Sequence, residues 1–301
     1  MKDFVFKVIT NIKSCKKNIE FTIKYFNKKV ATKKQGNQII YDAIILGKPC
    51  LIARGGAAEL NAVKGYLNKK YSNKVRTRIC KNAGVFPNND EFLNRFCEYY
   101  MSCLLKADIL SVWCVGAERK LVDRLDNSCK LIRLESLEPY YFDLPWSKAL
   151  ENKKVLIVSS FCKSIKSQYE KRELLFKNKD VLPKFKSICF VDAVVSNADN
   201  KTEYNDWFEA LNSMQQKIKE QDFDVAIIGA GAYSLPLAYF VKSIGKIAVQ
   251  MSGAIQILFG IKGKRWDTRK RFVKMYNENW IRPSKEEVPQ NADIVEGGCY
   301  W

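Results

Sequence analysis

The stretch with the clearest chemical potential is Arg54-Gly55-Gly56-Ala57-Ala58-Glu59, which directly follows the apolar run "CLIA". Two glycines permit a tight turn and close approach of the backbone to a ligand, and a helix beginning there would present its amino end to an anion. Arg54 suits phosphate neutralisation. Glu59 can cap the helix, hold a cation or act as a base, and the residue types leave these roles open.

A second glycine turn, Gly229-Ala230-Gly231-Ala232-Tyr233, follows the apolar run "DVAII". It lacks the third glycine of the dinucleotide fingerprint, and the next run ends "VQMSG" without an acidic residue for a ribose hydroxyl. We therefore interpret Gly229, Gly231 and Tyr233 as a turn that accommodates phosphate, and we expect no NAD.

Carboxylates and aromatic rings alternate in "ESLEPYYFDLPW", which follows the run "KLIRL". Rings can stack on the C–H faces of a sugar while carboxylates accept its hydroxyls, so Glu138, Tyr140, Tyr141 and Trp146 are candidates for a sugar or acceptor site. The same rings can equally form a buried flap.

A basic segment follows the run "KVLIVSS", where a helix would place Gln168 and Arg172 on one face and Lys163 near its beginning. These three side chains would form a cationic rim for phosphates. A solvated helix surface is the other interpretation.

The sequence contains no histidine among its 301 residues, which excludes Ser-His-Asp and Cys-His catalysis and imidazole zinc sites. The ten cysteines form no C-x-x-C pair, so we interpret them as reduced and structural and expect neither zinc nor haem. Any chemistry must use carboxylates, Lys, Arg, Tyr, Ser, backbone amides or a hard metal ion.

The formal charge of +19 favours a polyanionic partner, an anionic membrane surface or a phosphate-bearing substrate, although a lysine-rich coding bias would also produce it. Basic residues surround Trp266 between residues 262 and 274, as in some single-strand binders. No RNA-binding fold signature accompanies them, so the sequence argues against a nucleic-acid partner.

The elements that must position these residues are strand-like apolar runs alternating with helical stretches from about residue 43 onward. Such alternation predicts an α/β fold with a doubly wound, mostly parallel Rossmann-like sheet covered by helices on both faces. In such sheets ligands bind beyond the carboxyl ends of the strands, where the residues above fall.

Residues 1–42 are predicted to form a basic amphipathic helical extension, and residues 43–301 the Rossmann-like domain. The apolar positions between residues 3 and 28 recur at helical spacing, and such a helix can lie on an anionic bilayer or pack on its own domain. Without a signal sequence or a long apolar segment, we expect a cytoplasmic protein, with possible contact at the inner face of the plasma membrane.

The chain resembles bacterial cell-surface polysaccharide proteins related to the GT-D fold glycosyltransferases. That family has an Arg-x-Gly-Asp-Gly-Glu turn after an early strand, which Arg54, Gly56 and Glu59 match, while Ala57 stands in place of the motif's Asp and Ala58 in place of its second Gly. Further segments that look like a subgroup of such proteins are "NAGVFP", "LEPYYFDLPWS", "QYEKRELLF", "IIGAGAYSLPLA", "LFGIKGKRWD" and "VEGGCYW".

The resemblance implies a glycosyltransferase that moves a sugar from a nucleotide-sugar donor, a UDP-sugar being favoured, to a glycan or lipid-linked acceptor. Arg54, Gly55 and Gly56 would hold the diphosphate, and Glu59, Glu118 or Glu138 would act on the acceptor proton. Mn²⁺ or Mg²⁺ on Glu59 is implied by the family, but the loss of one carboxylate at Ala57 weakens that expectation. The alternative is a binding protein for nucleotide-sugars or polysaccharide precursors that has lost catalysis.

Overall fold

The computed structural model describes residues 18–301, in which eight strands form one sheet in the order β1-β4-β3-β2-β8-β7-β5-β6. Every neighbouring pair is parallel. The strands are β1 (Val30–Ala31), β2 (Cys50–Arg54), β3 (Ile109–Val112), β4 (Lys130–Arg133), β5 (Lys154–Ser159), β6 (Ser187–Asp192), β7 (Val225–Gly229) and β8 (Ile247–Gln250). The parallel α/β architecture predicted from the sequence is confirmed.

Alternate residues of the central strands enter two separate cores. In β5, Leu156 and Val158 belong to one apolar cluster, and Val155 and Ile157 belong to the other. All four side chains are fully buried. A strand buried on both faces has no polar side to alternate with, which explains the uninterrupted apolar runs in the sequence.

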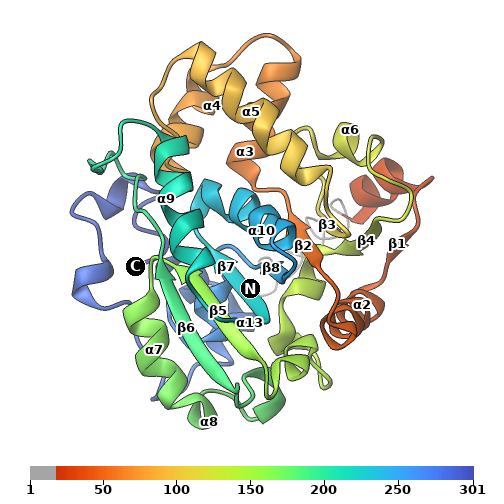
Figure 1. Ribbon diagram of the computed structural model, residues 1–301, viewed down its shortest axis with the longest axis vertical. Coiled ribbons are helices and arrows are strands. Elements are labelled where there is room, and N and C mark those ends of the chain that lie inside the picture. Colours follow the sequence, from red (N-terminus) through yellow and green to blue (C-terminus); the bar gives the residue numbers. More distant parts are fainter. Residues whose placement is uncertain (1–17) are drawn as a thin grey trace, which may run out of the picture.

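Helices cover both faces of the sheet, as Figure 1 shows. The longer helices are α2 (Lys33–Leu46), α3 (Ala57–Leu67), α5 (Asp90–Leu104), α7 (Cys162–Glu170), α9 (Trp207–Lys219) and α10 (Ser234–Ser243). The short helices are α4 (Asn73–Thr77), α6 (Glu118–Val122), α8 (Arg172–Leu175), α11 (Ala254–Leu258), α12 (Lys264–Asp267) and α13 (Lys270–Val273). Apolar residues of α3, α5, α9 and α10 line one core, and those of α2, α7 and α11 line the other.

Single turns occupy several connections. They are the π-helical turn η1 (Arg78–Asn82) and the 3₁₀ turns η2 (Leu134–Leu137), η3 (Pro139–Tyr141), η4 (Trp146–Leu150), η5 (Lys179–Val181), η6 (Gly231–Tyr233), η7 (Lys285–Glu287) and η8 (Ala292–Ile294). Three of them, η2 to η4, carry the chain from β4 to β5 in place of a longer helix.

The chain leaves the neighbouring strands β2 and β8 toward opposite faces of the sheet. After β2 it enters α3, whose Leu60 and Val63 lie in one core, and after β8 it enters α11, whose Ile255 and Ile257 lie in the other. Open α/β sheets commonly bind ligands where neighbouring strands diverge in this way. Arg54 ends β2 and therefore lies at this point of divergence.

The five apolar runs quoted from the sequence each correspond to one strand, namely β2, β4, β5, β7 and β8. The predicted boundary at residues 42 and 43 is wrong, because it falls inside α2. Thr32 caps that helix through a reciprocal capping box with Gln35, and β1 pairs with β4. Residues from 30 onward thus belong to the sheet domain. The first part of the predicted amphipathic helix lies outside the described residues.

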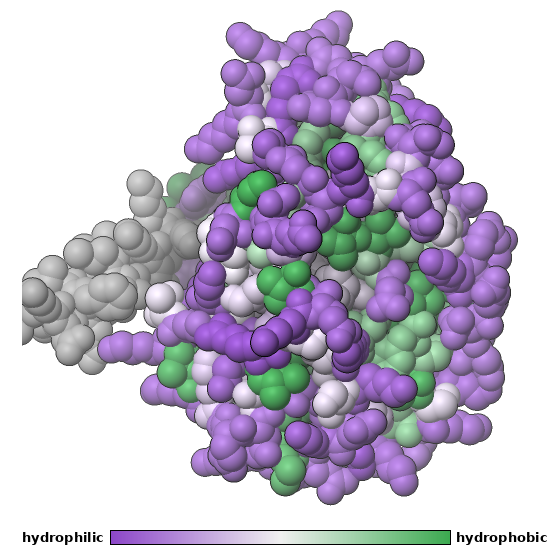
Figure 2. Space-filling model, turned by 90° about the vertical axis from the view of Figure 1, so that its left-hand side faces the viewer, coloured by the Kyte–Doolittle hydropathy of each residue, from purple (hydrophilic) through white to green (hydrophobic). Residues whose placement is uncertain are grey.

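The face that carries the edge strand β6 is largely hydrophilic, with an apolar area between polar rims (Figure 2). Within residues 18–301, no helix is long and apolar enough to cross a membrane.

Candidate functional site

Arg54 is held at the end of β2 by two neighbouring strands. Its backbone N–H donates to Gln250 Oε1 of β8 at 3.0 Å, and its guanidinium lies over the Trp113 ring, 5.0 Å from the centroid. The Trp113 indole N–H in turn donates to the Gly55 carbonyl at 3.0 Å. The arginine predicted from the sequence therefore lies over the Trp113 ring where β2 and β8 diverge.

Glu59 is folded beneath the glycine turn. A Cβ placed on Gly56 would stand 2.0 Å from Glu59 Oε2, so a larger residue there would displace the carboxylate from its present position. Burial raises the pKa of Glu59, against the lowering influence of its own backbone N–H and of Arg54. The Gly56 N–H donates to the Tyr100 hydroxyl at 3.0 Å, so this amide is already occupied. Glu59 thus supports the turn from within the first turn of α3.

Arg54, Arg269 and Arg271 all act electrostatically on the carboxyl group of Glu138, and Arg265 and Arg271 act on Arg269. Burial lowers the pKa of Arg269, and the positive charges of Arg265 and Arg271 lower it further. Arg271 lies over the rings of Tyr141 and Phe272, at 5.4 and 4.7 Å.

No carboxylate of the described chain neutralises these four arginines by an ion pair. Within residues 18–301 the arginines that form ion pairs are Arg76, Arg119, Arg172 and Arg282. Like charges that crowd together without a counterion are typical of an anion site. We refer to Arg54, Arg265, Arg269 and Arg271 as the arginine cluster.

Glu138 is the carboxylate that faces the arginine cluster. Burial raises the pKa of Glu138 to about 7. The positive charges of Arg271, Arg54 and Arg269 act to lower this pKa, and the negative charge of Glu135 acts to raise it. The positive charges therefore offset only part of the desolvation cost. A carboxyl group with a pKa near neutrality can give or take a proton at physiological pH.

Four polar atoms around the arginine cluster are buried without a hydrogen-bond partner in the described chain: Arg54 Nε, Glu138 Oε2 and the hydroxyls of Tyr140 and Tyr141. Burial raises the pKa of both tyrosines, so their hydroxyls stay protonated and can donate. A buried polar group without a partner costs free energy, and several together call for a ligand or ordered water. Of the sequence-predicted residues, Arg54, Glu138, Tyr140 and Tyr141 are thus brought together.

Glu118 lies behind this site and has a supporting position. Its Oε2 accepts hydrogen bonds from the Tyr25 hydroxyl at 2.6 Å and from the backbone N–H groups of Trp113 and Cys114 at 2.9 and 2.7 Å. Burial raises its pKa, and these hydrogen bonds lower it. Three donors leave this oxygen committed to the turn after β3, so Glu118 positions Trp113 rather than facing the arginine cluster.

Trp146 lies in the core, contrary to its prediction as a sugar-binding ring. It is fully buried, and its indole N–H donates to the Leu137 carbonyl at 3.3 Å. Its backbone N–H donates to Asn37 of α2. The flap interpretation therefore holds for Trp146, whereas Tyr140 and Tyr141 keep unpaired hydroxyls.

The cationic rim predicted at Lys163, Gln168 and Arg172 does not form. The Gln168 amide is fully buried and donates to the carbonyls of Gly260 and Asn279. Lys163 pairs with Glu286, and Arg172 with its neighbour Glu173. The amino end of α7 is occupied by carboxylates of η7, since Ser164 donates to Glu287. This arrangement disfavours a phosphate at that helix end.

The turn at Gly229 and Gly231 lies at the same sheet edge as Arg54, with only β8 between their strands. A Cβ on Gly229 would meet the Ser252 carbonyl oxygen at 2.7 Å, so packing already requires glycine there. The Ala83 carbonyl accepts from Ala232 N–H and covers the turn. Tyr233, predicted to bind phosphate, is buried instead, stacked on Trp207 at 4.8 Å with its hydroxyl 2.9 Å from Ser196 Oγ.

The residues at the glycine turn do not suit a divalent cation. Ala57 offers no ligand atom, Glu59 is buried beneath Gly56, and the nearby charged group is the cation Arg54. In the part of the chain that the structure describes, no three His, Cys, Asp or Glu side chains gather into a possible metal site. Mg²⁺ and Mn²⁺ prefer several oxygen ligands, so the arrangement does not fit the metal that the resemblance implied.

Sequence-based reasoning missed Arg265, Arg269 and Arg271 as site residues. They lie in the basic run around Trp266, which had been considered only as a nucleic-acid surface. No strand precedes this run closely, so the strand-end rule gave no signal, and only the packing of α12 and α13 brings Arg269 and Arg271 near Glu138.

No protein-family model matches this sequence, and no curated protein matches it either. Two solved structures are similar over most of the chain. One, a selenomethionine-substituted domain of unknown function 1792, has 12% identity and a TM-score of 0.48, covering 89% of this chain and 96% of the other. The other, described as a new glycosyltransferase (DUF1792) from Streptococcus sanguinis, has 12% identity and a TM-score of 0.46, covering 88% and 97%.

Proposed function

We propose that this protein is a glycosyltransferase that transfers a sugar from a nucleotide-sugar donor, with a UDP-sugar favoured, to a glycan or lipid-linked acceptor of surface-polysaccharide assembly. The observation that carries the proposal is Glu138, whose Oε2 is buried and unpaired and whose carboxyl group feels the positive charges of Arg54, Arg269 and Arg271, none of which forms an ion pair in the described chain. The resemblance of the glycine turn to the GT-D motif supports the same chemistry.

In this proposal the arginine cluster binds the donor diphosphate. Guanidinium groups make paired, charge-assisted hydrogen bonds to phosphate oxygens, and their positive charge stabilises the leaving diphosphate as the sugar–oxygen bond breaks. Arg54 is pre-oriented for this role by Trp113 and Gln250. The mechanism assigns no step to a metal ion.

Glu138 and the two tyrosines act on the sugar side of the reaction. The carboxylate form of Glu138 takes the acceptor hydroxyl proton, a role that suits a group whose pKa is about 7. The hydroxyls of Tyr140 and Tyr141 donate to sugar oxygens and so satisfy groups that are otherwise buried without partners. Glu59 keeps the glycine turn in place from below.

The test compares Arg271→Met with Lys274→Met, which removes one positive charge from the same segment outside the arginine cluster. UDP binding is measured by calorimetry and UDP release by a coupled assay over a panel of UDP-sugars. We expect Arg271→Met to weaken UDP binding about 10- to 100-fold, the range for a lost charge-assisted hydrogen bond, and Lys274→Met to leave it unchanged. Equal UDP binding by both variants and the natural protein would contradict the proposal.

A nucleotide-sugar binding protein without turnover is the second candidate, favoured by Ala57 in place of the motif's aspartate. The same assays separate the two. UDP binding that depends on Arg271, without UDP release in the presence of any donor or acceptor, would support the binding protein over the enzyme.

A further inference from the structure

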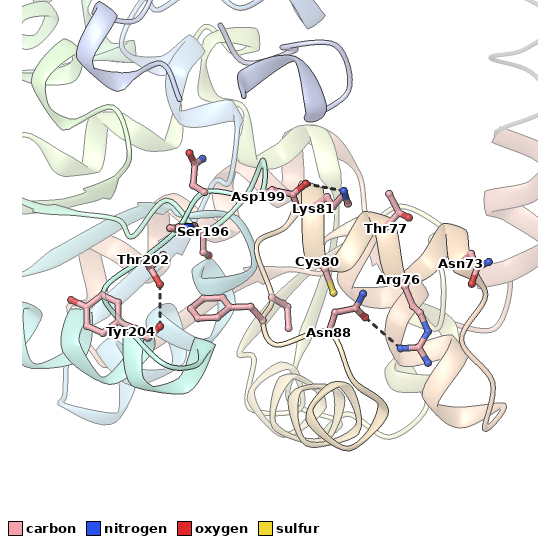
Figure 3. Close-up of a pocket in the computed structure, with 14 residues that line it drawn as sticks. Asn73, Arg76, Thr77, Cys80, Lys81, Asn88, Ser196, Asp199, Thr202 and Tyr204 are labelled. Carbon is pink, nitrogen blue, oxygen red and sulfur yellow. Dashed lines mark hydrogen bonds and ion pairs between the residues drawn. The ribbon is translucent and has the colours of Figure 1, made fainter. Parts of the chain in front are cut away.

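A cavity of about 580 Å³ lies beyond the carboxyl end of β6, away from the arginine cluster. One wall is formed by α4, η1 and the segment that follows them, and the other by the loop after β6, as the facing side chains in Figure 3 show. Its volume is in the range of small-molecule sites. Nothing in the proposed donor site accounts for it.

The backbone around this cavity departs from regular geometry on both walls. Residues Arg78–Asn82 form a π-helical turn, a rare conformation that recurs at functional sites. On the opposite wall, Ala198 and Asp199 have φ values of 57° and 55°, which two consecutive residues with side chains adopt only at a cost in strain. The Ala198 N–H donates to the Lys81 carbonyl at 2.7 Å and ties the two walls together.

The charged side chains that line the cavity largely neutralise one another. Lys81 pairs with Asp199 at 2.8 Å, and Arg76 pairs with Asp90 just outside it. Lys201 is the remaining charge among the lining residues. A site that keeps its charges in internal pairs offers little to a multiply charged anion, in contrast to the arginine cluster.

The other lining groups suit a ligand with both hydroxyls and apolar faces. Amides are supplied by Asn73, Asn88 and Asn200, hydroxyls by Thr77 and Thr202, and rings by Phe86 and Tyr204. Amide and hydroxyl groups can each donate and accept, as sugar hydroxyls require, and aromatic rings pack against the C–H faces of pyranoses. We infer that this cavity is a binding site for a neutral saccharide.

Saccharide binding by this cavity does not depend on the proposed function. The further step, that the cavity holds part of the acceptor glycan, rests on the proposed function. Four strand spacings separate β2 from β6, about 19 Å, so the site would hold a part of the acceptor remote from the reacting hydroxyl. Binding energy gained at such a distance can still be used to position the reacting end.

The cavity is also linked to the sheet edge by a short chain of contacts. Ser196 Oγ donates to the Gly84 carbonyl at 2.7 Å and lies 2.9 Å from the Tyr233 hydroxyl, directly after the turn at Gly231. The Phe86 carbonyl accepts from Trp207 N–H of α9. The cavity walls are thus anchored to the same edge as the donor site.

The experiment uses the full chain and neutral hexasaccharides as probes: β-1,4-linked glucose, β-1,4-linked N-acetylglucosamine and α-1,4-linked glucose, with UMP as the comparator. Binding is followed by saturation-transfer difference NMR and titration. Thr77→Trp fills the cavity from α4, and Lys74→Trp places the same ring on the same short helix outside the lining. Both positions are exposed, so both variants should fold.

We expect at least one hexasaccharide to bind, Thr77→Trp to weaken it tenfold or more, Asn88→Ala to weaken it about 2- to 10-fold, and Lys74→Trp to leave it unchanged. The inference would be overturned if no hexasaccharide bound, or if Thr77→Trp left hexasaccharide binding unchanged. It would also be overturned if Thr77→Trp weakened the binding of UMP and not that of a hexasaccharide. UDP binding measured on the same samples keeps the two proposals apart, because it reports the donor site alone.

Discussion

Glu138 combines burial, an unpaired oxygen and positive neighbours in one side chain. Its pKa of about 7 in the folded protein lies above the ordinary value of 4.5, so between these pH values the folded state holds a proton that the unfolded state has lost. Stability contributed by this group is therefore present at low pH and is lost as the pH rises toward 7. The loss amounts to about 3 kcal/mol at most.

We predict that Glu138→Gln removes this pH dependence. Urea unfolding at intervals from pH 4.5 to pH 8 should show the natural protein losing stability relative to the variant as the pH rises. Protein with bound UDP is excluded from this measurement, because a ligand would shift the balance.

Glu135→Gln is the matched control for Glu138→Gln. Burial alone would raise the pKa of Glu135, but the hydrogen bond from Lys33 and nearby charges outweigh it and the pKa is lowered. Its contribution is therefore already present above about pH 4.5 and is lost only at lower pH. A constant difference between Glu138→Gln and the natural protein across the whole range would contradict the raised pKa.

The position of a residue could be predicted when the sequence pattern that indicates it lies close to that residue in the chain. Arg54, Glu138, Tyr140 and Tyr141 follow strands, so the strand-end rule brought them together correctly in space, although their chemical roles stay predictions. Trp146 follows the same strand and was misassigned, because an indole suits a core as well as a sugar. Lys163 found its counterion in η7, which is remote in sequence and could not be foreseen.

The turn after β3 and the helix at residues 18–25 form one structural unit through Glu118. The Tyr25 hydroxyl and two backbone N–H groups converge on its Oε2, and the Arg119 side chain donates to the Lys24 carbonyl at 2.8 Å. A buried carboxylate with several donors is costly to alter, because its donors are left without an acceptor.

We predict that Glu118→Ala lowers the free energy of unfolding by about 3 kcal/mol, because three donors lose their acceptor, and that Tyr25→Phe, which removes one of these donors, lowers it by roughly 1–2 kcal/mol. Thermal and urea unfolding measure both changes. The folded fraction of Glu118→Ala should bind UDP within a few-fold of the natural protein. If the Glu118 variant kept the stability of the natural protein but lost UDP release, a catalytic role for Glu118 would be supported instead of a structural one.

Elements were predicted well where their pattern was long. The apolar runs "KVLIVSS" and "DVAII" correspond to the buried central strands β5 and β7. The strand β1 was missed because two residues give no periodicity. The helix α2 runs through Gly36, a residue with low helix propensity that gives no helical signal in the sequence.

At the scale of the whole molecule, the helix of residues 18–25 carries exposed apolar side chains. Phe21 and Tyr25 face the core, while Ile19, Ile23 and Phe26 are 56%, 68% and 82% exposed. These three are spaced to share one face of a helix, and the sequence of residues 1–34 has ten lysines against two acids. We propose that this segment contacts anionic lipid.

We predict that the full chain sediments with vesicles containing anionic phospholipid and that changing Ile19, Ile23 and Phe26 together to serine reduces the bound fraction about tenfold or more. Ile45→Ser with Leu46→Ser is the matched control, since these exposed apolar residues lie on α2. Sedimentation with neutral vesicles to the same extent, or equal loss in both variants, would contradict a specific membrane-facing helix.

The position of β8 in the sheet determines at which point of synthesis the sheet can be completed. Of the described strands, β8 leaves the ribosome last, yet it pairs with both β2 and β7. It thereby joins the half of the sheet formed by β1 to β4 to the half formed by β5 to β7. Until residue 250 has emerged, a nascent chain exposes two unfinished strand edges that invite mispairing. Synthesis through residue 250 must therefore precede completion of the sheet, and shorter translation products should be substrates for chaperones and proteases.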